Sequence, residues 1–172
     1  MSRTMPVRLI LGALAVMFAV ACGEHASPTS PASTLAPPPT PKPPKGSQIA
    51  SCNIPKTVTV SKRIGRAGGR IDLGQHNTFE ILPGALRHDT TITARIPAGT
   101  QERVQFSPEG LQFLVPTILT LNYSPCVTPT IGVTISYLQA DTVVEVIQTA
   151  NDPISKTVKG FVRHFSSYAV AY

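Results

Sequence analysis

The sequence predicts an all-β fold, an antiparallel β-sandwich of about eight to ten short strands, in residues 48–172. Apolar residues there alternate with polar ones, glycine and proline interrupt the alternation at regular intervals, and no stretch of helical length keeps a 3.6-residue period. An up-and-down barrel is the alternative, but prolines between the strands favour the corners of a sandwich. The clearest alternating segments are residues 57–61, 78–82, 91–96, 103–106, 119–123 and 133–137.

Residues 1–21 have the pattern of a secretory signal peptide. Arg3 and Arg8 precede an uncharged apolar run from Leu9 to Ala21, which ends in small residues. The run is shorter than the roughly 18 to 20 residues that a membrane-spanning helix needs. We therefore expect an exported protein.

Cys22 follows this segment directly, in "AVAC" before Gly23. The segment resembles the lipobox of bacterial lipoproteins, although that family usually has leucine where this chain has Ala19. The resemblance implies that Cys22 becomes the lipid-carrying first residue of a membrane-anchored lipoprotein. Glycine rather than aspartate after the cysteine implies the outer membrane. The alternative is ordinary cleavage after Ala21, which leaves an unmodified cysteine.

The number of cysteines predicts one disulfide bond. The chain has three cysteines, so a lipid on Cys22 leaves Cys52 and Cys126 as a pair. Outside the cytoplasm such a pair can form a disulfide that persists. The alternative is two buried free thiols.

Residues 22–47 predict a disordered tether ahead of the domain. From Ala26 to Gly46 the chain is mostly proline, serine, threonine and alanine, which favours an extended, semi-rigid spacer. A proline-rich ligand for another protein is the alternative. Residues 48–172 are enough for one compact domain, and few aromatic residues accompany its basic ones, which disfavours nucleic-acid binding.

The stretches "AGGRIDLGQHNTFEILPGALRHDTTITARI" and "VQFSPEGLQFLVPTILTL", in residues 67–121, resemble the ZU-five domain, a β-sandwich module. Gly68 and Gly69 match its early turn, and residues 79–86 match an apolar strand that runs into a Pro-Gly-Ala-Leu corner. Residues 108–121 match its Pro-x-Gly-x-x-Phe-x-x-Pro-x-x-Leu-x-Leu segment. The resemblance implies a compact bacterial relative of this fold, and it carries over no catalytic residue. The core-facing positions we expect are Phe79, Ile81, Phe113, Leu119 and Leu121, and the expected positive-φ turns are at Gly84 and Gly110.

The final segment "RHFSSYAVAY" resembles the cleavage motif of self-cleaving ZU-five proteins and of the GAIN domains of adhesion receptors. The resemblance would make Ser166 the nucleophile that attacks the Phe165 carbonyl, with His164 as the base. The alternative, which we favour, is a plain turn that Ser166 supports, with Tyr168 and Val170 in the core.

The remaining residues predict no enzyme activity, no cofactor and no metal. The four histidines have no metal-binding spacing, and neither a phosphate-binding loop nor a serine-hydrolase elbow is present. We therefore expect a non-enzymatic binding or structural module of the cell envelope. Its expected partners are the membrane, through the lipid on Cys22, and an envelope protein or glycan. An autoprocessing module that cuts between Phe165 and Ser166 is the alternative.

Overall fold

The computed structural model describes residues 47–129 and 132–172. The predicted signal peptide, Cys22 and all but the last residue of the predicted tether lie outside these residues. Within the described ranges, no helix is long and apolar enough to cross a membrane.

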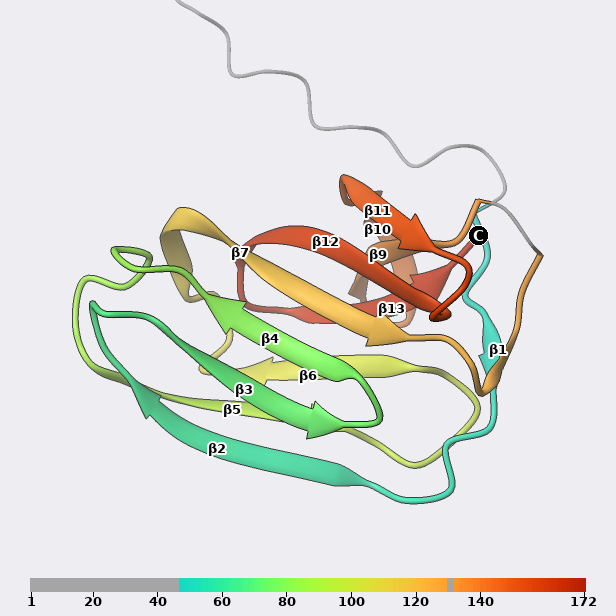
Figure 1. Cartoon of the computed structure of the whole chain (residues 1–172), viewed down its shortest axis with the longest axis horizontal. Helices are drawn as coiled ribbons and strands as arrows, with labels where there is room; N and C mark the ends of the chain where they lie inside the picture. Colours follow the sequence, from blue (N-terminus) through green and yellow to red (C-terminus); the bar gives the residue numbers. More distant parts are fainter. Residues whose placement is uncertain (1–46, 130–131) are drawn as a thin grey trace, which may run out of the picture. The chain divides into compact units, whose positions relative to one another are not determined.

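The prediction of an all-β antiparallel sandwich is confirmed. Two sheets lie one on the other, and a short two-stranded sheet closes one end (Figure 1). The described residues form thirteen strands, more than the eight to ten expected. The excess has two sources: β1 and β8 are only two residues long, and the weakly alternating stretch after residue 139 divides into two short strands.

All strand pairings are antiparallel, and the strand order is as follows. The six-stranded sheet runs β10 (Thr142–Val146), β9 (Thr134–Gln139), β13 (Ser167–Ala171), β6 (Arg103–Ser107), β5 (Thr90–Ile96) and β2 (Val58–Ile64). The five-stranded sheet runs β11 (Thr149–Asp152), β12 (Thr157–His164), β7 (Gln112–Asn122), β4 (Asn77–Ile81) and β3 (Gly69–Gly74). The third sheet pairs β1 (Ser51–Cys52) with β8 (Cys126–Val127).

The alternating segments bury one face of each sheet, as the sequence predicts. In β5, Ile92 and Ala94 are fully buried whereas Arg95 is exposed. Of the five predicted core positions, Phe79, Ile81, Leu119 and Leu121 are buried, and Phe113 is partly buried against the core. Burying each large apolar side chain contributes about 1.5–3 kcal/mol, so the facing stripes are what hold the sheets together.

Aromatic rings fill the centre of the core between the two sheets. The ring centroid of Phe79 on β4 lies 4.5 Å from that of Phe106 on β6. Phe165, in the link between β12 and β13, stacks on Phe106 at 4.9 Å and contacts Phe113 at 5.0 Å. This cluster joins both sheets to the link that contains the predicted cleavage motif.

The two expected turn glycines have positive φ. Gly84 has a φ of 79° in the Pro-Gly-Ala-Leu corner, and Gly110 has a φ of 76° in the loop between β6 and β7. Other residues rarely adopt this conformation, so both predictions are confirmed.

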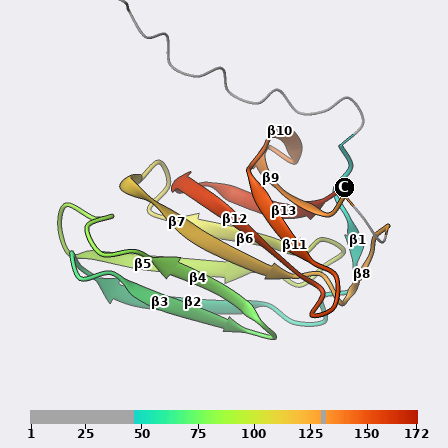
Figure 2. The same cartoon turned by 45° about the horizontal axis from the view of Figure 1, so that its top comes forward.

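The two ends of the described chain meet at one end of the sandwich. Gln48 and Tyr172 exchange backbone hydrogen bonds of 2.8 and 3.0 Å, and the Ala50 N–H donates to the Val170 carbonyl. The β2–β3 turn and the loop between β4 and β5 lie at the opposite end in both views (Figures 1 and 2). A chain that enters at Gln48 therefore leaves those loops on the far side of the domain.

The predicted disulfide between Cys52 and Cys126 is confirmed. The two cysteines are directly opposite each other in the β1–β8 pair, and their sequence separation is 74. The bond ties the first strand of the domain to the segment that follows β7. It closes a long loop, which restricts the unfolded chain.

We expect the Cys52→Ala/Cys126→Ala double variant to unfold more easily than the wild type. Loop-closure entropy sets the loss of unfolding free energy at about 4.5 kcal/mol at most, and urea titration of both proteins measures it. An unchanged urea midpoint, or two titratable thiols in the unfolded, unreduced wild type, would contradict the expectation.

Candidate functional site

The predicted cleavage motif lies in the tight link between β12 and β13. His164 is the last residue of β12, and Phe165 and Ser166 form the link before β13. The Phe165 side chain is 1% exposed because the aromatic cluster surrounds it. The packing of Phe165 in the core therefore anchors the link. Tyr168 and Val170, which we expected in the core, are both buried.

Backbone hydrogen bonds hold this link on both sides of the Phe165–Ser166 bond. The Phe165 N–H donates to the Leu111 carbonyl at 2.8 Å, and the Phe106 N–H donates to the Ser166 carbonyl at 3.2 Å. The Phe165 carbonyl oxygen accepts a hydrogen bond from the Gly110 N–H at 3.2 Å. Attack on the Phe165 carbonyl would place negative charge on this oxygen, so the Gly110 N–H has the position of an oxyanion donor.

The His164 side chain faces two tyrosines. Its ring makes an edge contact with Tyr137 at 5.2 Å, and Nδ1 lies 3.5 Å from the Tyr168 hydroxyl. That hydroxyl donates to the His164 carbonyl at 2.7 Å, and burial, followed by the charge of Glu145, raises the pKa of Tyr168. Tyr168 is therefore a neutral donor that holds the end of β12.

The three motif residues are consecutive in the chain, but the geometry does not assemble them for catalysis. The structure gives no hydrogen bond between His164 and the Ser166 hydroxyl. The φ angles of Phe165 and Ser166 are not positive, and the bond between them is not cis. The one catalytic feature in place is the Gly110 donor, a backbone group that no side-chain pattern reveals.

A second candidate, Glu102, was missed by the sequence analysis. Its side chain is only 2% exposed, and its Oε1 atom has no hydrogen-bond partner among the described residues. The alternation that buries Phe106 and Val104 continues back to Glu102, so the period of two could have identified it.

Glu102 lies at the end of the sandwich that carries the disulfide, within a small polar network. The Asn77 side chain hydrogen-bonds to Glu102 and accepts from the Asn122 N–H at 2.7 Å. The Glu102 carbonyl accepts from the Val170 N–H at 3.0 Å. These contacts connect β4 and β7 of one sheet to β13 of the other.

A cavity of about 20 Å³ adjoins the carboxyl group of Glu102. About half of its lining residues are apolar, and Lys56, Gln75 and Asn77 supply its other polar side chains. This volume suits one water molecule and is too small for an organic ligand. Burial raises the pKa of Glu102 to about 7, while the hydrogen bond from Asn77 lowers it in part.

Neither a metal site among the described residues nor a match to a known protein adds to these two candidate sites. In the part of the chain that the structure describes, no group of three or more histidine, cysteine, aspartate or glutamate side chains could hold a metal ion. No protein-family model matches the chain, and no curated protein matches it. The resemblance to the ZU-five domain therefore stays a prediction.

We expect the stability of the wild type to fall as pH rises from about 4.5 to 8. The native state keeps a proton on Glu102 up to about pH 7, whereas the unfolded state releases it near the ordinary pKa of 4.5. In this range the native state binds more protons than the unfolded state, so the free energy of unfolding falls as pH rises. Each tenfold difference in proton affinity between the two states corresponds to about 1.4 kcal/mol. The loss at pH 8 is therefore about 3 kcal/mol at most.

Denaturant titration across this pH range tests the assignment to Glu102. The Glu102→Gln variant keeps the shape of the side chain without its charge, so its unfolding free energy should fall less than that of the wild type. Glu109→Gln, an exposed position in the β6–β7 loop, is the control and should follow the wild type. Parallel pH profiles for Glu102→Gln and the wild type would contradict the prediction.

Proposed function

We propose that this chain is an exported, lipid-anchored bacterial protein whose β-sandwich is a non-enzymatic binding or structural module of the cell envelope, with its anchor in the outer membrane. The observation that carries the proposal is the position of the chain ends. Gln48 pairs with Tyr172 at one end of the sandwich, and the β2–β3 and β4–β5 loops lie at the other. A domain tethered through residues 22–47 would hold those loops away from its anchor.

The described side chains support binding over catalysis. His164 is turned toward Tyr137 and Tyr168, and the cavity beside Glu102 admits no organic substrate. The loops far from the tether offer the accessible surface that a binding module needs. An envelope protein or glycan is the partner class that we propose for this domain.

Autoprocessing between Phe165 and Ser166 is the second candidate function. One observation favours it: the Gly110 N–H already donates to the Phe165 carbonyl oxygen. A proton acceptor would also have to reach the Ser166 hydroxyl, and His164 would have to leave its contact with Tyr168 to do so. We therefore rank it below the binding function.

The anchor is tested by Cys22→Ser, which removes the proposed site of lipid attachment. We expect this variant to leave the membrane fraction, because a lipid chain supplies the apolar area that holds the wild type there. Fractionation of cells that express either protein measures the change. Cys52→Ala/Cys126→Ala is the control and should stay with the membranes. A Cys22→Ser protein that still fractionates with membranes would refute the anchor.

Autoprocessing is tested by intact mass under denaturing, reducing conditions. We expect the wild type to remain one chain through Tyr172 and Ser166→Ala to differ from it by one oxygen atom. Ser167→Ala, which removes the neighbouring hydroxyl, is the matched control. A wild-type fragment that ends at Phe165, persists in Ser167→Ala and disappears in Ser166→Ala would instead establish self-cleavage.

A further inference from the structure

A strip of exposed arginine and apolar side chains borders the five-stranded sheet at the end away from Gln48. Hydrogen bonds to two backbone carbonyls of the β4–β5 loop connect its parts. The Arg66 Nε donates to the Arg87 carbonyl at 3.0 Å, and the Leu114 N–H donates to the Ala85 carbonyl in the same β4–β5 loop at 3.0 Å. We call this strip the basic rim, and its residues are Arg66, Arg87, Leu114, Val115, Phe161 and Arg163.

A break in strand register brings the rest of the rim together. Val162 on β12 lies opposite Thr117 on β7, but His164 lies opposite Gln112, so residues 113–116 bulge out beside Arg163. The exposed fractions are 55% for Leu114 and 38% for Val115 on this bulge. Phe161, two positions before Arg163 on the outer face of β12, is 52% exposed.

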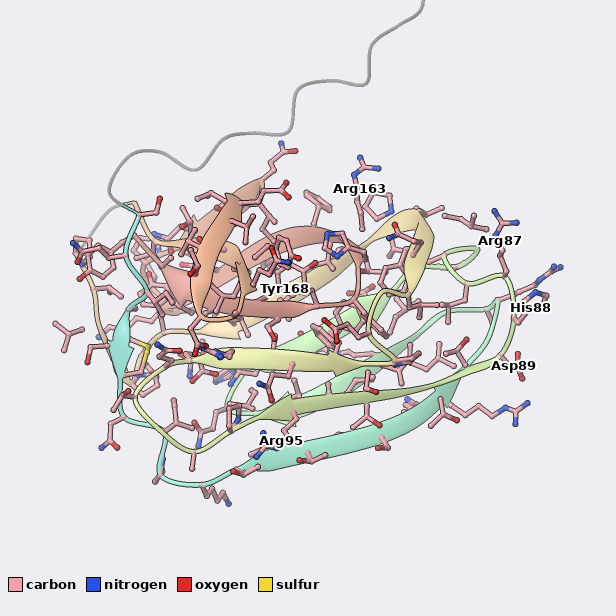
Figure 3. All side chains as sticks on the ribbon, turned by 180° about the vertical axis from the view of Figure 1, so that it is seen from behind. Arg87, His88, Asp89, Arg95, Arg163 and Tyr168 are labelled. Carbon is pink, nitrogen blue, oxygen red and sulfur yellow. A yellow bond between two sulfur atoms is a disulfide. The ribbon has the colours of Figure 1, made fainter. Side chains whose placement is uncertain are left out.

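In the described part of the chain, carboxylates do not neutralise the rim arginines, although the Nε of Arg66 is engaged with the Arg87 carbonyl. The ion pairs among the described residues are Arg63 with Asp89 and Arg103 with Asp141, so none involves a rim arginine. Figure 3 shows Arg163 projecting at the top of the molecule and Arg87 at its upper right, with Arg95 near the bottom.

The rim also has an excess of positive charge. Its three arginines, at positions 66, 87 and 163, add three positive charges, and the nearby carboxylate of Asp89 is already paired with Arg63, which lies outside the rim. The rim therefore favours an anionic partner, and this partner must also contact the apolar side chains that lie between the arginines.

We propose that the basic rim docks on the anionic lipid surface of a membrane other than the one that holds the anchor. Arginines beside protruding leucine, valine and phenylalanine side chains suit a lipid interface, where cations meet phosphate groups and apolar side chains enter the acyl boundary. A glycan would leave the three apolar side chains in water. A protein partner would need a complementary surface of about 800 Å² around a bulge.

That the docked membrane is a second one rests on the proposed function and on where the tether joins the domain. Gln48, where the tether joins the domain, lies at the opposite end from the β4–β5 loop of the rim (Figure 1). A lipid at Cys22 would thus hold one membrane while the basic rim faces another.

A vesicle-bridging assay tests the proposal with the full chain. The protein is first inserted through its own anchor into phosphatidylcholine vesicles, which are then mixed with acceptor vesicles that contain phosphatidylglycerol. We expect capture of the anionic acceptors, loss of capture at high salt because salt screens the charges, and no capture of pure phosphatidylcholine acceptors.

Four variants locate the contact. Arg87→Glu and Arg163→Glu should each lower capture about tenfold or more, since one basic residue contributes roughly fivefold near an anionic surface and the reversal adds repulsion. Phe161→Ser should lower capture without a change of charge. Arg95→Glu is the matched control, with the same charge change on the outer face of β5, and should behave as the wild type. Urea midpoints verify that all four remain folded.

The outcomes separate this inference from the proposed function. Failure of the wild type to float with the first vesicles would refute the anchor, and the same variants would then be assayed by direct cosedimentation with phosphatidylglycerol vesicles. Equal loss in Arg95→Glu and Arg87→Glu would show that net charge alone attracts the protein, and would overturn the docking site. Capture that requires envelope proteins in the acceptor vesicles would assign the rim to a protein partner instead.

Discussion

The pairing of β13 with two neighbours is the interaction on which the rest of the structure depends. β13 hydrogen-bonds to β6 on one side and β9 on the other, so it joins two halves of the six-stranded sheet. The Val170 carbonyl also receives the Ala50 N–H, which fixes the segment that leads to Cys52. Without β13, the aromatic cluster would lose one wall, because Phe165 is positioned by the strand that follows it.

Much of this fold could be predicted from the alternation of side chains. β3, β5 and β6 each bury every second residue, and their turns carry glycine or proline where the chain must reverse. The alternation is less informative in β12. Phe161 is apolar but lies on the outer face, whereas Val158 and Val162 of the same strand are in the core. A pattern of residue types gives the period of a strand, but the neighbouring sheet decides which face is inside.

The candidate site was only partly accessible to sequence reasoning. His164, Phe165 and Ser166 could be identified as a motif, yet the decisive features are spatial: the Gly110 N–H on the Phe165 carbonyl and the tyrosines around His164. Gly110 and Tyr137 are distant from the motif in sequence, and although Tyr168 is only four residues from His164, its contact with the ring is not visible in the sequence. Glu102 was overlooked for a different reason, since charged residues are rarely buried and composition argues against placing one inside.

The place of β13 in the order of synthesis has a consequence for folding. It follows every other strand in sequence, and its partners β6 and β9 lie about 60 and 30 residues earlier. A chain delivered in sequence order cannot close its larger sheet, or complete the aromatic cluster, until β13 has arrived. Non-local pairing of this kind makes closure slow, and if the chain is exported as proposed, it would leave the cell's interior before its larger sheet has closed.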